Sequence, residues 1–241
     1  ENPDGQLTGG IQATGNYPGK ASTIDQARAD LDKAMSLLPG KQRLNLHAFY
    51  GDFTQGKADR DQIEPKHFES WAQWAKAKEI GIDFNCTLFS HEKANSGFTL
   101  SDLDKGVRDF WIEHVKRCRN IAAYLGEELG TRSVHNIWIP DGAKDTTINR
   151  FKHRELLKDS LDQIMAVKQN PKFMADAVEA KLFGIGAEAF TVGSHEFYMG
   201  YAITKGILLC LDAGHFHPTE GIADKISSSL LYLDELLLHV S

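Results

Sequence analysis

The chain has 241 residues, 41% of them hydrophobic and 25% charged, which is the ordinary composition of a globular protein. Its 27 basic and 33 acidic residues give a formal net charge of −6 without a basic stripe, which argues against nucleic acid as a partner. No apolar run approaches the roughly 20 residues that a membrane span requires, and the polar first residues do not resemble a signal peptide. We therefore expect a cytoplasmic protein in which Cys86, Cys118 and Cys210 are buried, reduced thiols.

The first part of the chain predicts a loop, a helix, a strand and a second helix. Residues 1–20 are rich in Gly, Asn and Pro and show no apolar period, so they predict a loop. A capping box begins at Thr23, and the apolar period after it predicts a helix over residues 24–38. Alternating apolar residues predict a strand over 43–50, and Pro65 is typical of the first turn of the next helix.

The alternation of strands and helices continues to the end of the chain. A strand is predicted over residues 82–89, and Ser101-x-x-Asp104 is expected to cap a long helix that runs through Glu128. Residues 134–139 predict the next strand. The later elements are a helix over 149–168, a strand over 177–185, a helix over 196–204, a strand over 207–212, a helix over 223–233 and a strand over 236–240.

Six strands alternating with helices predict a parallel sheet with right-handed crossovers. Two layouts fit this order, an open doubly wound sheet and a (β/α)₈ TIM barrel. Polar residues follow many successive strands, which favours the barrel, because all its strands end around one site. We therefore expect a single barrel domain over residues 1–241 that supplies about six strands and is incomplete at both ends.

Two segments match nucleotide-binding motifs only in part. Residues 14–21 resemble a phosphate-binding loop, yet they lack its first Gly and its closing Ser or Thr. Residues 184–189 resemble a dinucleotide-binding loop, yet the acidic residue expected about 20 positions later is absent. The sequence therefore favours neither kind of site.

Three successive predicted strands carry possible metal ligands near their carboxyl ends. The first offers Glu179, with Lys181 two residues later and hence on the same face of an extended strand. The second ends with Asp212 and is followed by His215, and the third contains His239. Carboxylates combined with imidazoles suit Mn²⁺, Mg²⁺, Co²⁺ or Zn²⁺.

Each of these residues also has a plainer interpretation. Glu179 and Lys181 could form an ion pair, and His239 could be an ordinary core histidine. Near other strand ends, Trp138 could be a packing residue and His91 a loop histidine. Buried charges are unfavourable unless they are paired or bound to a metal, and three adjacent strands place one at the same edge. The combination therefore favours a metal site over separate structural roles.

Five longer segments resemble the bacterial L-rhamnose isomerase family. They cover residues 9–20, 136–142, 178–188, 193–201 and 210–220. The resemblance implies a (β/α)₈ barrel, a homotetramer and two divalent cations per subunit, typically Mn²⁺. It also implies a small sugar substrate, with interconversion of L-rhamnose and L-rhamnulose.

The same resemblance implies a role for each candidate residue. Glu179, Asp212 and His239 would bind a structural metal ion, and His215 would bind a second, catalytic one. The family pattern continues past His239 with further aspartate ligands that are not in this chain. We therefore expect the 241-residue piece alone to be inactive.

The remaining implied roles concern the sugar. Lys181 would act in catalysis, Trp138 would line the sugar site, and His91 would contact the sugar near ring opening. Because the sequence offers no strong base for an enediol mechanism, we expect a metal-assisted hydride shift. Two alternatives stay open, an inactive piece of such an enzyme and a metal-dependent barrel phosphodiesterase; the acidic net charge weighs against the second.

Overall fold

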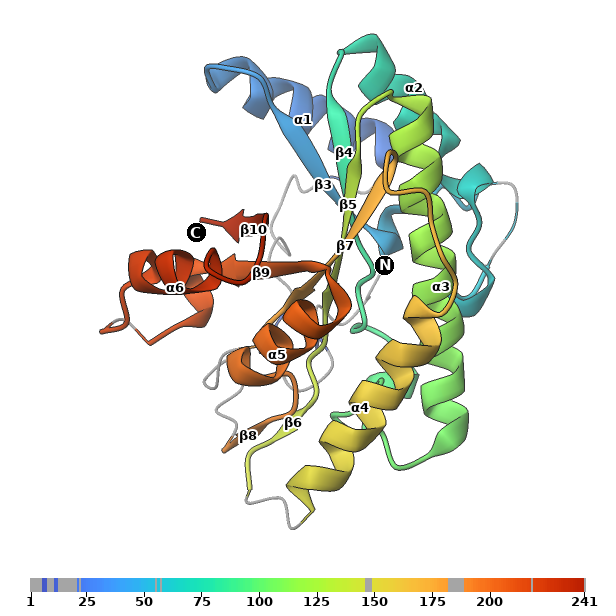
Figure 1. The fold of residues 1–241 in the computed structure, drawn as a ribbon. Coiled ribbons are helices and arrows are strands. Elements are labelled where there is room, and N and C mark those ends of the chain that lie inside the picture. Colours follow the sequence, from blue (N-terminus) through green and yellow to red (C-terminus); the bar gives the residue numbers. More distant parts are fainter. Residues whose placement is uncertain are drawn as a thin grey trace.

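Six parallel strands form one curled sheet in the computed structural model of the protein (Figure 1). The structure describes residues 6–7, 11–12, 21, 23–54, 56, 58–145, 149–181, 189–217 and 219–240. The sheet strands are β3 (Arg43–His47), β4 (Gly81–Asn85), β5 (Ser133–Trp138), β7 (Met174–Glu179), β9 (Leu208–Asp212) and β10 (Leu236–His239). Within this sheet each strand pairs with the next one along the chain, so the order across the sheet never reverses. A doubly wound sheet reverses at a switch point, and this order confirms the barrel fold, of which the chain supplies six strands.

Helices connect the strands and pack against one face of the sheet. Figure 1 shows α2, α3 and α4 side by side along this face, and α3 packs on β4, β5 and β7. The helices are α1 (Ile24–Leu37), α2 (Glu69–Ala77), α3 (Lys105–Glu128), α4 (Arg150–Met165), α5 (His195–Lys205) and α6 (Ile222–Ser229). No helix in the described ranges is both long and apolar enough to cross a bilayer.

Short elements complete the described part of the chain. Single turns of 3₁₀ helix cover Ala48–Tyr50, Arg60–Gln62, Pro65–Phe68, Glu92–Ala94 and Ala213–His215. Two antiparallel pairs join β1 (Gln6–Leu7) to β2 (Ile11–Gln12) and β6 (Gly142–Ala143) to β8 (Phe190–Thr191). The first pair lies where the sequence predicts a loop. The two rejected nucleotide motifs fall largely outside the described residues.

The predicted helix starts are correct at one helix and wrong at another. The Thr23 hydroxyl accepts a hydrogen bond from the backbone N–H of Gln26 at 3.2 Å and caps α1 as expected. The long helix α3 starts later than Ser101-x-x-Asp104 predicts, because the Asp104 carboxylate itself accepts from the N–H of Gly106 at 2.7 Å. The Ser101 hydroxyl donates to Asp141 instead, so a contact distant in sequence replaces the predicted cap.

Two strands, β3 and β4, end earlier than the apolar runs predict. Residues 82–89 were expected to form one strand, but β4 stops at Asn85. Thr87 and Ser90 have φ values of 52° and 56°, which are incompatible with an extended strand. Likewise, β3 ends at His47 and continues into a 3₁₀ turn. The residues after each strand therefore form loops at the carboxyl edge of the sheet.

The two faces of the sheet differ in chemistry. The face toward the helices is apolar and buried, with Leu46, Phe84, Ile137, Val178 and Leu211 in its strands. Each fully buried side chain of this kind stabilises the fold by about 1.5–3 kcal/mol. Because side chains alternate along a strand, the opposite face carries the other set: His47, Asn85, Asn136, Trp138, Glu179, Cys210, Asp212 and His239. The sheet thus separates an apolar core from a polar inner surface.

One ion pair interrupts the apolar layer between helices and sheet. Arg119 of α3 donates to the Asp176 carboxylate of β7 through both Nε and Nη2 at 2.9 Å. His135 Nδ1 lies 3.1 Å from the same carboxylate. Arg119 Nη1 also donates to the backbone carbonyls of Ile164 and Val167 at 2.7 and 2.6 Å. Arg119 therefore fastens α3 to β7 and to the last turn of α4.

We expect Arg119→Met to lower the free energy of unfolding by about 3–5 kcal/mol, because it leaves the Asp176 carboxylate buried without its cation. Denaturant unfolding followed by circular dichroism measures the change. Lys105→Met is the control, since the Lys105–Asp109 pair is exposed and should contribute less than about 1 kcal/mol. Equal losses in the two variants would contradict this assignment.

Candidate metal centre

The four predicted metal ligands converge at the carboxyl edge of the sheet. Glu179 is the last residue of β7, Asp212 the last of β9 and His239 the last of β10. The strand register pairs His239 with Asp212 and places Glu179 beside Cys210. His215 lies in the 3₁₀ turn that follows β9. Parallel strands end at one edge, so residues far apart in sequence meet there.

The Glu179 carboxylate lies at the centre of this cluster. Its Oε1 atom is 3.1 Å from His215 Nδ1 and 3.4 Å from His239 Nδ1. The Asp212 Oδ2 atom is 3.6 Å from His239 Nδ1 and 3.9 Å from His215 Nε2. The Glu179 side chain is only 4% exposed, so protein groups or a bound ion, rather than water, must compensate its charge. These distances are short enough for one cation to contact several of the four side chains.

Each carboxylate has one oxygen fixed by the protein and one turned toward the histidines. Glu179 Oε2 accepts a short hydrogen bond from Asn136 Nδ2, and Asp212 Oδ1 accepts from the N–H of Gly214 at 2.7 Å. The remaining oxygens, Glu179 Oε1 and Asp212 Oδ2, face the imidazoles. Oxygen and nitrogen donors arranged in this way suit a divalent cation such as Mn²⁺, Mg²⁺, Co²⁺ or Zn²⁺. The residues present therefore fit a metal site.

The charges of the cluster shift the pKa values of its members. Burial raises the pKa of Glu179, but hydrogen bonds and charges from His215 and His239 outweigh burial and lower it to about 2. Burial lowers the pKa of His215, yet Glu179 and Asp212 outweigh this effect, so the pKa of His215 is raised. Hydrogen bonding to Glu179 also raises the pKa of His239. In the metal-free chain, protons on the two histidines partly supply the positive charge that a cation would bring.

Cys210 is a member of the cluster that the sequence analysis missed. One potential ligand atom each from Glu179, Cys210 and His239 lies within 4.8 Å of the others. Burial, together with the charges of Glu179 and Asp212, raises the pKa of the Cys210 thiol, so the sulfur is protonated at neutral pH. The signal in the sequence was the two-residue spacing from Asp212, which puts both side chains on one face.

A group of aromatic side chains adjoins the candidate metal ligands. The Trp138 ring lies 6.3 Å from the His215 ring, and Phe89 packs edge-on against Trp138 at 5.6 Å between centroids. His47 lies 6.1 Å from Phe89 and 5.5 Å from Phe49. The buried Trp138 Nε1 has no hydrogen-bond partner within the described ranges. The predicted sugar-site residue Trp138 is therefore beside the predicted ligand His215.

Lys181 is held next to the end of β5 by its side chain and by its backbone. Its Nζ donates to the Pro140 carbonyl at 2.6 Å, and its backbone N–H donates to the Gly193 carbonyl at 3.0 Å. The following residue, Asp141, accepts four hydrogen bonds from Thr99 and Ser101 and is fully buried. The loop that holds the Lys181 ammonium group is therefore itself fixed.

The structure does not bring His91 into the cluster. His91 Nε2 lies 3.0 Å from Asp59 Oδ1, His91 Nδ1 accepts from the N–H of Lys93, and the ring stacks on Phe110 at 4.9 Å. His47, at the end of β3, is nearer to the ligands. Burial lowers the pKa of His47 to about 4, and the charges of Glu179 and His239 act on it.

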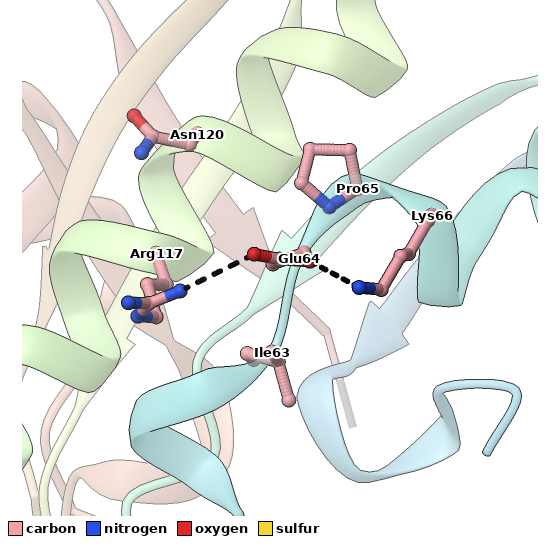
Figure 2. A pocket seen from close by; sticks show the side chains of 6 residues that line it. All are labelled: Ile63, Glu64, Pro65, Lys66, Arg117 and Asn120. Atoms are coloured by element: carbon pink, nitrogen blue, oxygen red, sulfur yellow. Dashed lines mark ion pairs between the residues drawn. The ribbon is translucent and has the colours of Figure 1, made fainter. Parts of the chain in front are cut away.

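A cleft on the outer surface is separate from this centre (Figure 2). It has a volume of about 420 Å³ and is lined by Ile63, Glu64, Pro65, Lys66, Arg117 and Asn120. Glu64 bridges Lys66 at 2.5 Å and Arg117 at 4.0 Å, so its carboxylate is paired with cations. None of the candidate metal ligands lines this cleft.

Comparison with known proteins identifies a family that matches the whole chain. The sequence profile of the L-rhamnose isomerase (RhaA) family matches residues 1–241. The chain is 58% identical to an L-rhamnose isomerase of Citrobacter koseri and 59% identical to one of Escherichia coli K12, in both cases over all 241 residues. The chain spans 57% of the length of each of these relatives.

Solved structures share the fold at low sequence identity. A D-psicose 3-epimerase of Clostridium cellulolyticum, solved with D-tagatose, superposes with a TM-score of 0.54 at 13% identity. That superposition covers 91% of this chain and 68% of the epimerase. A 3-keto-D-glucoside 4-epimerase of Escherichia coli gives a TM-score of 0.50 at 12% identity, over 73% of this chain and 65% of that one.

We expect Glu179→Gln to lower the pKa values of both His215 and His239, because it removes the charge that raises them. Histidine resonances in an NMR pH titration of the metal-free protein report both values. Glu64→Gln, in the surface cleft, is the matched control and should leave both unchanged. Unchanged histidine values in Glu179→Gln would show that the carboxylate does not act on them.

The same shifts fix the sign of the pH dependence of stability. Histidines with raised pKa values stabilise the folded state below the ordinary value of 6.5, and this contribution is lost as pH rises through their folded values. The melting temperature of the metal-free chain should therefore fall as the pH rises above about 6.5, and fall less in Glu179→Gln.

Proposed function

Since the chain belongs to the L-rhamnose isomerase family, we propose that the whole protein interconverts L-rhamnose and L-rhamnulose. The observation that carries the proposal is the convergence of Glu179, Asp212, His215 and His239 at one edge of a parallel sheet. Aldose–ketose isomerisation moves hydrogen between C1 and C2 of an open-chain sugar, and it requires both oxygens to be held and polarised. A site with two carboxylates and two imidazoles can hold the ion that does this.

We propose that Glu179, Asp212 and His239 bind a structural divalent cation and that His215 binds a second, catalytic one. A bound cation would supply Lewis-acid polarisation of the sugar oxygens. The unprotonated forms of His215 and His239 are the ligands, so cation binding displaces their protons. The proposed reaction transfers hydride from C2 to the C1 carbonyl carbon while the proton of the C2 hydroxyl passes to the C1 oxygen.

Neighbouring side chains support the binding of a sugar. Trp138 and Phe89 offer an apolar wall beside His215, which would pack on the C–H face of the sugar and exclude water. Lys181, 4% exposed, is the proposed cation that stabilises negative charge on a sugar oxygen. The resemblance implies that His91 contacts the sugar near ring opening. The position of His47 beside Phe89 supports this role for His47 better than the contacts of His91 support it for His91.

We further propose Mn²⁺ as the physiological ion, two per subunit, in a cytoplasmic homotetramer. The donor set supports this choice of metal, although it would also accept Co²⁺, Mg²⁺ or Zn²⁺. Residues 1–241 would contribute to a single barrel domain. The net charge of −6 gives no support to a nucleic-acid substrate.

The whole protein should form ketose from L-rhamnose, lose this activity with EDTA and regain it with Mn²⁺. Glu179→Gln and Asp212→Asn should each reduce the rate to background, because each removes a charged ligand from the cluster. A colorimetric ketose assay measures the rate, and Glu64→Gln should keep it unchanged. Normal activity in either ligand variant, or cleavage of phosphodiesters without isomerase activity, would overturn the proposal.

The hydride step makes a separate prediction. L-rhamnose deuterated at C2 should give L-rhamnulose that retains the deuterium at C1, because a hydride that moves directly does not exchange with water. Mass spectrometry and proton NMR of the product measure the retention. Wash-out of deuterium into the solvent would instead indicate proton transfer through a protein base.

A further inference from the structure

Asn136 lies behind the cluster and contacts its central carboxylate. It is on β5, two residues before Trp138 and on the same inner face, and it is 1% exposed. Its Nδ2 atom donates to Glu179 Oε2, and this hydrogen bond links β5 to the end of β7. A carboxylate only accepts hydrogen bonds, so the amide must present its nitrogen to Glu179.

The hydrogen bond gives the two Glu179 carboxylate oxygens different partners. Oε2 is held by Asn136, and Oε1 faces His215 and His239 at 3.1 and 3.4 Å. Rotation of the carboxylate would break the bond to Asn136 and turn Oε1 away from the histidines. The Asn136 amide therefore sets the direction in which Glu179 offers its free oxygen.

The chemistry of an amide matters as much as its position. An amide satisfies a buried oxygen without neutralising its charge, so the carboxylate keeps its attraction for a cation. Asp176, on the other face of the same strand, shows the alternative, because Arg119 pairs with it at 2.9 Å and neutralises it. One strand thus carries a carboxylate that is already paired with a cation and one that remains able to bind a cation.

Asn136 is also imperfectly satisfied. Its Oδ1 atom is buried and has no hydrogen-bond partner among the residues that the structure describes. A buried polar atom without a partner destabilises a fold, so a purely structural position would favour an apolar residue. The Glu179 contact gives a reason for a polar side chain here.

We propose that Asn136 is a positioning residue that orients Glu179 for cation binding. The inference rests on the proposed metal site, but it concerns a residue that is not itself a ligand. Outer hydrogen bonds of this kind typically affect metal affinity by about 10–100-fold.

The test is Mn²⁺ affinity, measured by electron paramagnetic resonance of free Mn²⁺ in the whole protein. Asn136→Ala and Asn136→Leu should each weaken binding by about 10–100-fold while keeping the circular dichroism spectrum of the wild type. The matched control is Asn85→Ala. Asn85 is the neighbour of Asn136 on β4, faces the same way and is 6% exposed, but its amide oxygen accepts from the N–H of Thr87.

Each outcome decides the proposal. A folded Asn136 variant that binds Mn²⁺ within twofold of the wild type would overturn it, as would an equal loss in Asn85→Ala. Failure of both Asn136 variants to fold would assign the residue to stability and would also overturn it. A wild type that binds no Mn²⁺, Mg²⁺, Co²⁺ or Zn²⁺ would instead refute the metal site itself, and with it the proposed function.

Discussion

The arrangement of this protein depends on one buried negative charge, that of Glu179. A carboxylate removed from water is strongly unfavourable unless other groups compensate it, and here the groups come from three other strands or the loops after them. Asn136, His215 and His239 approach it from β5, the turn after β9 and β10. The parallel order of the sheet makes this possible, because every strand ends at the same edge. The parallel pairing of the strands therefore determines both the fold and the position of the site.

Much of the fold follows from local patterns, because a buried parallel strand needs a continuous apolar run and each helix needs an amphipathic period. The ends of these elements depend on distant contacts. Ser101 fits a capping motif, yet Asp141, 40 residues later, takes its hydroxyl hydrogen bond. The apolar run after Asn85 continues, yet the positive φ of Thr87 ends the extended conformation. A sequence pattern does not contain these competing interactions.

The candidate site also combines residues that local patterns reveal with residues that only contacts between strands reveal. Glu179, Asp212 and His239 could be chosen from the sequence because a charge at the end of an apolar strand is conspicuous. The two-residue spacing of Cys210 from Asp212 could have added it to this set. Asn136 could not be chosen, because it becomes part of the site only through its hydrogen bond to Glu179 on the neighbouring strand. The loop histidines were hardest to rank, since the orientation of His91 is set by Asp59 and Phe110 rather than by its own strand.

The position of His239 on β10 has a consequence for how the sheet is held together. β10 pairs with β9, and this register places His239 beside Asp212. A cation shared by Glu179, Asp212 and His239 would connect β10 to β7 and β9 as a removable cross-link. The folded state would then be stabilised in proportion to the logarithm of the free-ion concentration, once that concentration exceeds the dissociation constant. In such an arrangement one bound ion would both hold neighbouring strands together and take part in the chemistry.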